Sequence, residues 1–261
     1  MTEKIKPVAL VTGATSGIGL EIATRLAQSG NRVFICSRSA DHLATVLKDF
    51  QAEGLEVDGQ TCDVSDPAQI RAFVAAAVAR FGPVGILVNN AGRSGGGITQ
   101  DVPDELWLDV INTNLNSVFL MTKEVLNNGG MSGSGWGRII NIASTGGKQG
   151  VLHGAPYSAA KHGVVGLSKA WGLELAKTGI TVNAVCPGFV ETPMAEKVRA
   201  HYAGIWGVST EEAHSRVTAR VPMGRYVETA EVAAMVDYLI SDGAAAVTAQ
   251  ALNVCGGLGN Y

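Results

Sequence analysis

The chain has 261 residues, of which 46% are hydrophobic and 16% charged, with a net charge of −3 and a mean hydropathy of +0.19. This length suits one large α/β domain, and the slight acidity argues against nucleic acid as the main partner. No apolar run approaches the ~18 residues of a membrane span, and the first ten residues lack a signal-peptide core, so we expect a soluble cytoplasmic protein.

The first motif is a glycine-rich turn that follows an apolar run at 8–11. Gly13, Gly17 and Gly19 are spaced G-x-x-x-G-x-G, and an amphipathic segment begins within them. Glycines let the backbone approach a pyrophosphate closely, and the free amides of a helix N-terminus bind anions. The order strand, glycine-rich turn, helix therefore predicts a dinucleotide site.

The second strand, at 32–37, is followed by Arg38. An NAD-binding chain commonly has an acidic residue at this place, where it holds the ribose 2′-hydroxyl. A guanidinium suits a 2′-phosphate instead, so the sequence favours NADPH over NADH. Alternatively, Arg38 is a surface residue with no role in cofactor binding. The acidic residue Asp41 nearby leaves this alternative open.

Strands and helices alternate along the whole chain, which predicts a parallel sheet covered on both faces. Further strands are expected at 57–62, 84–88, 139–143, 181–186 and 251–254, and helices at 39–53, 67–80, 103–127, 154–176 and 228–241. Asp63 and Val64 follow one strand and are placed beside the adenine. Asn89-Asn90-Ala91-Gly92 follows another, at the strand end where ligands of open α/β sheets bind.

Three amides interrupt the long helix expected at 103–127. Asn112, Asn114 and Asn116 are two residues apart, so they cannot all share one helix face. An asparagine inside a helix can hold water or perturb the hydrogen-bond ladder. Any one of them is also readily explained as a solvated polar residue.

The strongest chemical signal lies between Ser144 and Lys161. Tyr157 and Lys161 are four residues apart and share one face of a helix. An ammonium beside a phenol favours the phenolate, so we expect Lys161 to lower the pKa of Tyr157 and to create a proton donor and acceptor for a carbonyl reaction. Ser144, at the end of a strand, could hydrogen-bond the carbonyl oxygen.

The remaining stretches carry less chemistry. A long irregular segment with a helical piece near Ser209 predicts a lid over 189–222. The four cysteines and five histidines form no metal-binding spacing, so no metal is expected. No linker or repeat divides the chain, which we interpret as a single domain spanning 1–261.

The motifs occur in one order and spacing that resembles the short-chain dehydrogenase/reductase family over essentially the whole chain. They are Thr12-Gly13-x-x-x-Gly17-x-Gly19, Asn89-Asn90-Ala91-Gly92, Asn114, Ser144, Tyr157-x-x-x-Lys161 and Pro187-Gly188. The resemblance implies a seven-stranded Rossmann-like domain, usually a homotetramer. It implies four catalytic roles: Tyr157 donates the proton, Lys161 assists it and holds the nicotinamide ribose, Ser144 orients the carbonyl, and Asn114 anchors a relay water.

Several stretches further resemble the actinorhodin-type ketoreductases of aromatic (type II) polyketide synthases. They are 8–21, 90–93, 95–97, 141–151, 184–194 and 247–261. This resemblance implies NADPH-dependent reduction of one ketone, typically at carbon 9, of a poly-β-ketone held on an acyl carrier protein, coupled to closure of the first ring. Gly95 and Gly96 match the loop thought to set the stereochemistry.

The motifs and the resemblance together assign the binding residues. The cofactor residues are Gly13, Thr15, Ser16, Gly17, Ile18, Gly19, Arg38, Asp63, Val64, Asn90, Ala91, Gly92, Tyr157, Lys161, Pro187, Gly188, Val190 and Thr192. The substrate residues are Ser94, Gly95, Gly96, Ser144, Gln149, Val151, His153, Tyr157, Phe189, Met194, Tyr202 and Trp206. Arg38 and Arg93 are candidates for docking the carrier protein or its phosphopantetheine.

Two other functions stay open. One is a 3-oxoacyl-(acyl carrier protein) reductase of fatty-acid synthesis, which performs the same chemistry on a linear chain. The other is an idle family member that binds NADP(H) as a sensor or scaffold. The intact set Asn114, Ser144, Tyr157 and Lys161 argues against an idle protein.

Overall fold

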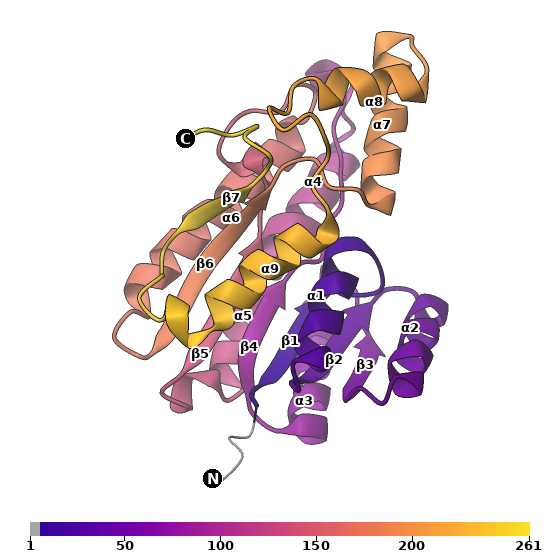
Figure 1. Cartoon of the computed structure of the whole chain (residues 1–261). Coiled ribbons are helices and arrows are strands. Elements are labelled where there is room, and N and C mark those ends of the chain that lie inside the picture. The colour runs from indigo at the N-terminus through magenta and orange to yellow at the C-terminus, as the bar shows by residue number, and fades with distance from the viewer. Residues whose placement is uncertain (1–5) are drawn as a thin grey trace.

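The computed structural model describes residues 6–261. The expectation that no signal peptide is present concerns the first ten residues, of which the first five lie outside the described range. Within the described range, seven parallel strands form one sheet in the order β3-β2-β1-β4-β5-β6-β7 (Figure 1). The strands are β1 (Val8–Thr12), β2 (Arg32–Ser37), β3 (Val57–Thr61), β4 (Val84–Asn89), β5 (Gly137–Ile142), β6 (Ile180–Pro187) and β7 (Ala251–Val254). The predicted Rossmann-like architecture is confirmed.

The sheet is buried because its central strands are apolar on both sides. Every residue of β1, β4, β5 and β6 is buried. In β1, Ala9 and Val11 belong to the core on one face, whereas Val8 and Leu10 belong to the core on the other. This continuous apolar pattern is what a parallel sheet between two helical layers requires.

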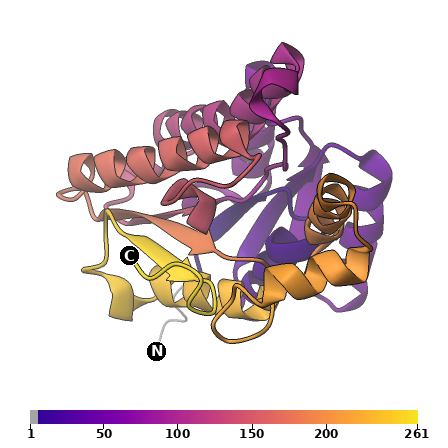
Figure 2. The same ribbon diagram turned by 90° about the horizontal axis from the view of Figure 1, so that it is seen from above.

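Helices cover both faces of the sheet (Figure 2). Helices α1 (Gly17–Gln28), α2 (Ala40–Ala52) and α9 (Thr229–Ile240) supply one core. Helices α3 (Pro67–Phe81), α5 (Ser117–Asn127) and α6 (Ala155–Glu174) cover the opposite face. Short 3₁₀ turns lie at Thr99–Asp101, Met131–Gly133, Thr145–Gly147 and Asp242–Ala244.

The segment after β6 is more regular than the sequence predicts. It forms two helices, α7 (Pro193–Trp206) and α8 (Thr210–Thr218), which stand beyond the carboxyl ends of the strands (Figure 1). The expectation of an irregular stretch before Ser209 was therefore wrong. Thr192 caps α7 by accepting from the amide of Ala195, and Pro193 occupies the first turn, which proline favours.

The helix expected at 103–127 is divided where the asparagines lie. Helix α4 (Asp104–Ile111) is followed by a π-helical turn, Asn112–Asn116, and then by α5. The side chain of Asn112 accepts a hydrogen bond from Asn116 at 2.7 Å, and Asn114 is fully buried. The expected perturbation of the ladder is thus a wider turn that carries an inward-facing amide. Such π-turns often accompany functional sites.

No helix among residues 6–261 is long and apolar enough to cross a membrane. The same residues contain no cluster of three or more potential metal ligands. All four cysteines are free thiols in buried positions, at residues 36, 62, 186 and 255.

Candidate active site

The glycine-rich turn is joined to the turn after β4 by the Asn90 side chain. The Asn90 amide group donates to the carbonyls of Thr12 and Gly13, at 2.9 and 3.0 Å. In return, the Thr12 hydroxyl accepts from the backbone amides of Asn90 and Ala91, both at 3.0 Å. Two turns that are far apart in the sequence therefore form one rigid surface at the carboxyl edge of the sheet.

The glycines are required by this close contact. Gly13 has φ of +64°, and a Cβ there would lie 2.9 Å from the Cα of Ala91. A Cβ on Gly19 would collide with the Asn90 side chain and the Gly13 carbonyl. Ser16 begins α1 without capping it by its side chain, so the first-turn amides near Ile18 are left for an anionic ligand. The residues present fit the pyrophosphate of a dinucleotide.

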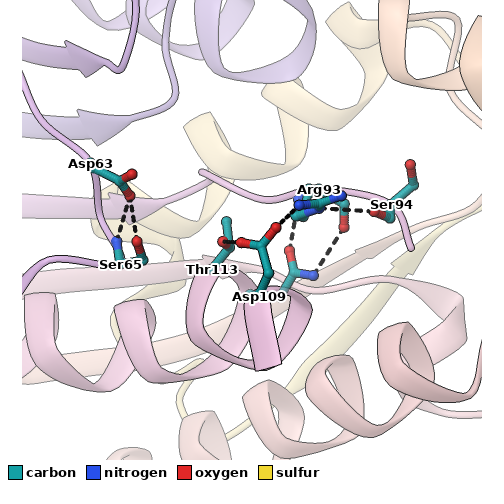
Figure 3. Close-up of polar contacts among 7 residues, drawn as sticks. Asp63, Ser65, Arg93, Ser94, Asp109 and Thr113 are labelled. Carbon is teal, nitrogen blue, oxygen red and sulfur yellow. Dashed lines mark hydrogen bonds and ion pairs between the residues drawn. The ribbon is translucent and has the colours of Figure 1, made fainter. Parts of the chain in front are cut away.

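Two further turns border this surface. After β2, the Ser37 hydroxyl accepts from Thr15 at 3.1 Å, and Arg38 is exposed. After β3, an Asp63 carboxylate oxygen accepts from the amide and the hydroxyl of Ser65, at 2.9 and 2.7 Å (Figure 3). These contacts fix the Asp63 side chain beside buried Val64, where the sequence places the adenine.

The end of β6 closes the other side. The Gly188 amide donates to the carbonyl of Val254 in the last strand at 3.0 Å, immediately after Pro187. Val190 is buried and forms a bridge with Val227. Thr192 then lies against the glycine-rich turn, because a Cβ on Gly17 would be 3.1 Å from its methyl group.

Ser144 and Tyr157 form the reactive pair of hydroxyls. Ser144 follows β5, and its hydroxyl accepts from the amide of Gly146 at 3.0 Å. Tyr157 comes from the first turn of α6, and its phenol lies near the Ser144 hydroxyl, which favours the charged form of the phenol. A Cβ on Gly146 would be 3.4 Å from both side chains, so only glycine leaves the space between them clear.

Lys161 lies one turn further along α6 and is 5% exposed. Its ammonium donates to the carbonyl of Ile142 at 2.8 Å and lies 5.8 Å from the centre of the Tyr157 ring. Burial lowers the pKa of Lys161 to about 8. The sequence gives no sign of the Ile142 carbonyl as a partner, because any residue at that position supplies one.

The expected lowering of the Tyr157 pKa is wrong for the protein without cofactor. Burial raises the pKa of Tyr157, and the nearby Ser144 hydroxyl offsets this only in part. The ammonium of Lys161 donates to the backbone carbonyl of Ile142 and not to the phenol, so it does not offset the effect of burial on Tyr157. The phenol is therefore protonated at neutral pH, which is the form that donates a proton to a ketone.

Asn114 lies close to Lys161, across Gly92. A Cβ on Gly92 would be 2.7 Å from the Asn114 amide oxygen and 3.7 Å from the Lys161 amine. The Asn114 side chain is held at both ends by Arg93, whose amide donates to it at 2.8 Å and whose carbonyl accepts from it at 2.9 Å. The structure thus brings all four residues with predicted catalytic roles to one place.

The predicted substrate residues fall into two groups. The first group borders the reactive hydroxyls. The backbone amide of Gln149 donates to the carbonyl of Thr145, and that of Val151 donates to the hydroxyl of Ser158. The carbonyl of His153 accepts from the backbone amide of Gly97 at 2.8 Å. Gly95 packs against Val110, and Gly96 against the backbone at His153. Ser94 belongs to the same loop.

The second group lies in 189–222, the segment after β6 that the sequence predicts to be a lid. Tyr202 stacks on Trp206 with ring centres 4.8 Å apart, and Phe189 lies 5.5 Å from Tyr226. Tyr202 is buried in a core that α7 and α8 share, whereas Met194 is exposed. These aromatic residues hold the lid together, and any contact they make with a substrate stays a prediction.

Two supporting residues were missed from the sequence. Thr12 was read as part of the glycine motif without a role of its own, although a hydroxyl at a strand end beside a glycine turn is a usable signal. Asp109 contacts Arg93 and was not considered. Its only signal is the four-residue spacing to Thr113 on a helix.

A glycine-rich dinucleotide turn, a serine–tyrosine pair and a buried lysine at one sheet edge define a nicotinamide-dependent oxidoreductase. The sequence pattern of the short chain dehydrogenases matches residues 7–203. The chain belongs to this family.

Relatives extend the match to the whole chain. A protein of Streptomyces violaceoruber named as ketoacyl reductase 1 of the granaticin polyketide synthase is 75% identical over 256 residues, covering 98% of this chain and 94% of that protein. A crystal structure of a variant actinorhodin polyketide ketoreductase with NADPH has a TM-score of 0.97 and 68% identity, with 100% of both chains covered. A 3-oxoacyl-(acyl-carrier-protein) reductase of Escherichia coli is 39% identical, covering 96% of each chain.

Proposed function

We propose that the protein is an NADPH-dependent ketoreductase of aromatic polyketide antibiotic biosynthesis. It reduces one ketone, at carbon 9, of a poly-β-ketone held on an acyl carrier protein. The observation that carries the reaction is the pair of Ser144 and Tyr157, which face each other across Gly146 beside buried Lys161, at the edge that carries the dinucleotide turn. The 75% identity to a granaticin reductase supports the substrate class.

NADPH, when bound, supplies the hydride. The ketone oxygen lies between the hydroxyls of Ser144 and Tyr157, which both donate to it as negative charge develops. Tyr157 then transfers its proton to that oxygen, and its raised pKa keeps this proton in place until the transfer. Lys161, with a pKa near 8, is able to return a proton to Tyr157 at neutral pH.

Cofactor and proton supply are assigned to residues around this pair. The amides of the glycine-rich turn hold the pyrophosphate, Arg38 the 2′-phosphate, and Lys161 the nicotinamide ribose. Asn114 holds the water that connects Lys161 to solvent. Arg38 is well suited to a phosphate because it is exposed, and its side chain forms no hydrogen bond or ion pair with any of residues 6–261.

Docking of the acidic carrier protein is assigned to Arg38 and Arg93. The two arginines differ in their surroundings, because the guanidinium of Arg93 is paired with Asp109. Arg38 is also assigned the 2′-phosphate, so with NADPH bound each arginine has an anionic partner besides the carrier protein. We further propose a homotetramer that covers exposed apolar side chains of α4–α6, such as Leu108, Phe119 and Leu173.

The second candidate is reduction of linear 3-oxoacyl chains in fatty-acid synthesis. The 39% identity to the Escherichia coli reductase favours the same chemistry, but it is much lower than the identity to the polyketide reductases. An idle NADP(H)-binding protein is disfavoured, because the four side chains to which we assign catalytic roles lie together at one edge of the sheet.

The test is reconstitution with an acyl carrier protein and a ketosynthase that builds an aromatic poly-β-ketone. With NADPH, we expect a product two hydrogen atoms heavier than that formed without the protein, with the alcohol at carbon 9. The Tyr157→Phe variant serves as the control and gives the unreduced product. Unreduced product with the unchanged protein would refute the proposal.

A further inference from the structure

The carboxylate of Asp109 contacts Arg93, whose backbone binds the Asn114 side chain, and Thr113, which precedes Asn114 in the chain. Asp109 lies in the last turn of α4, and its side chain pairs with the guanidinium of Arg93 (Figure 3). Its other carboxylate oxygen accepts from the hydroxyl of Thr113 at 3.2 Å. Thr113 directly precedes Asn114 in the π-helical turn, so Asp109 joins this turn to the loop that carries Arg93.

The contacts close a ring around Asn114. The backbone of Arg93 holds both polar ends of the Asn114 side chain, at 2.8 and 2.9 Å. The side chain of Arg93 is held in turn by Asp109 and by the carbonyl of Ser94, at 3.3 Å. Loss of Asp109 therefore frees the loop and the π-turn together.

A π-turn needs such support because its hydrogen bonds are less favourable than those of an α-helix. Asn114 is fully buried, and the Arg93 backbone bonds both polar atoms of its amide, which fixes the orientation of that amide. Small displacements of a catalytic group lower the rate without changing the fold.

We propose that Asp109 is a positioning residue that holds Asn114 in place by tying Arg93 to Thr113. This inference rests on the proposed function, in which Asn114 supports proton delivery. Because the pair of Asp109 and Arg93 is partly exposed, at 44% and 35%, its contribution to overall stability is small. The effect is therefore expected in the catalytic rate and in local order.

The kinetic test uses a rigid bicyclic ketone and saturating NADPH. Asp109→Ala is expected to lower kcat roughly three- to tenfold and to leave the KM for NADPH unchanged. Asp109→Asn retains part of the rate, because its amide oxygen still accepts from Thr113. The control is Glu105→Gln, an exposed carboxylate in the first turn of the same helix, which should change nothing.

A double variant shows whether Asp109 acts through Asn114. In an Asn114→Ala background, Asp109→Ala should cause no further loss of rate. An equal loss in both backgrounds, or no loss in the unchanged protein, would overturn the inference. If the unchanged protein reduces no ketone at all, the proposed function has failed instead.

Hydrogen exchange tests the inference without any substrate. Asp109→Ala should speed amide exchange in 112–117, whereas Glu105→Gln should not. Unchanged exchange in 112–117 would show that the ring of contacts does not hold the π-turn, whatever the kinetics.

Discussion

The amine of Lys161 lies 5.8 Å from the centre of the Tyr157 ring, and its hydrogen bond goes to the carbonyl of Ile142 and not to the phenol. The lysine thus approaches the tyrosine from the side of the sheet, at the end of β5. Burial acts on both groups, raising the pKa of Tyr157 and lowering that of Lys161 to about 8. A protonated phenol with a protonated lysine beside it, able to restore the proton that the phenol gives up, suits ketone reduction near neutral pH.

Replacing Tyr157 by phenylalanine should remove the proton donor. We expect kcat for ketone reduction to fall by roughly 10²- to 10⁴-fold, while the affinity for NADPH measured by fluorescence changes little. Tyr238→Phe, at an exposed position on α9, is the matched control. A Tyr157→Phe enzyme with near-normal kcat would mean that another group donates the proton.

The pKa of Lys161 predicts a fall in activity in alkaline solution. Above about pH 8, Lys161 loses its proton and can no longer restore that of Tyr157, which itself stays protonated because its pKa is raised. The value of kcat/KM for NADPH, which reflects the enzyme without cofactor, should therefore decline above about pH 8. In an active Lys161→Arg enzyme, the side chain stays positively charged, so the decline in kcat/KM should be absent. A decline at the same pH in that variant would mean that another titrating group causes it.

The lowered pKa of Lys161 also makes the free energy of unfolding depend on pH. The folded protein binds fewer protons than the unfolded chain between about pH 8 and 10.5, the ordinary pKa of lysine. The contribution of Lys161 to the free energy of unfolding therefore rises with pH across this window and is least favourable below it.

The contact between Gly19 and Asn90 predicts that Gly19→Ala damages the cofactor site. The new methyl group would displace the amide that joins the two turns. We expect a loss of roughly 1–3 kcal/mol in the free energy of unfolding and weaker NADPH binding. Gly204→Ala in α7 is the control, because no atom lies within 4 Å of the new Cβ. Equal effects of the two changes in denaturant unfolding and NADPH titration would show that the contact is unimportant.

Arg38 should decide the preference for NADPH. A charge-assisted hydrogen bond contributes about 1.5–3 kcal/mol, so Arg38→Ala should raise the KM for NADPH about 10- to 100-fold and leave that for NADH nearly unchanged. Arg71→Ala, which removes another exposed arginine on α3, should alter neither. A parallel rise in both KM values would mean that Arg38 does not recognise the 2′-phosphate.

Arg199 should hold the lid closed. One nitrogen of its guanidinium donates to both carboxylate oxygens of Glu191 at 2.9 Å, and the group lies over the ring of Tyr226. We expect Arg199→Ala to raise the KM for a bulky ketone several-fold and to speed proteolysis within α7 and α8. Lys197→Ala, exposed on α7, is the control. Unchanged proteolysis would show that other contacts hold the lid.

Much of the fold and site could be predicted because each depends on local patterns. Apolar runs that end in glycine, asparagine or serine placed the strands and identified their carboxyl ends. The four-residue spacing of Tyr157 and Lys161 placed both on one helix face. These features follow from periodicity and from the chemistry of single residues, which a sequence displays directly.

Other features depend on contacts that the sequence does not display. The pKa of Tyr157 depends on its burial and on the direction of the Lys161 ammonium, and the motif specifies neither. The ring formed by Asp109, Arg93 and Thr113 joins residues whose pairing requires the folded loop. The sequence does not predict α7, whose few apolar residues pack against α8 and against Phe189 and Tyr226, in a cluster that contains no strand residue.

The most direct test is NADPH oxidation with a rigid bicyclic ketone and a linear β-ketoacyl thioester side by side. An aromatic polyketide reductase should turn over the bicyclic ketone with the higher kcat/KM, because its pocket accepts a substrate in which a ring forms before or during reduction. A clear preference for the linear thioester would contradict this function and assign the protein to fatty-acid synthesis.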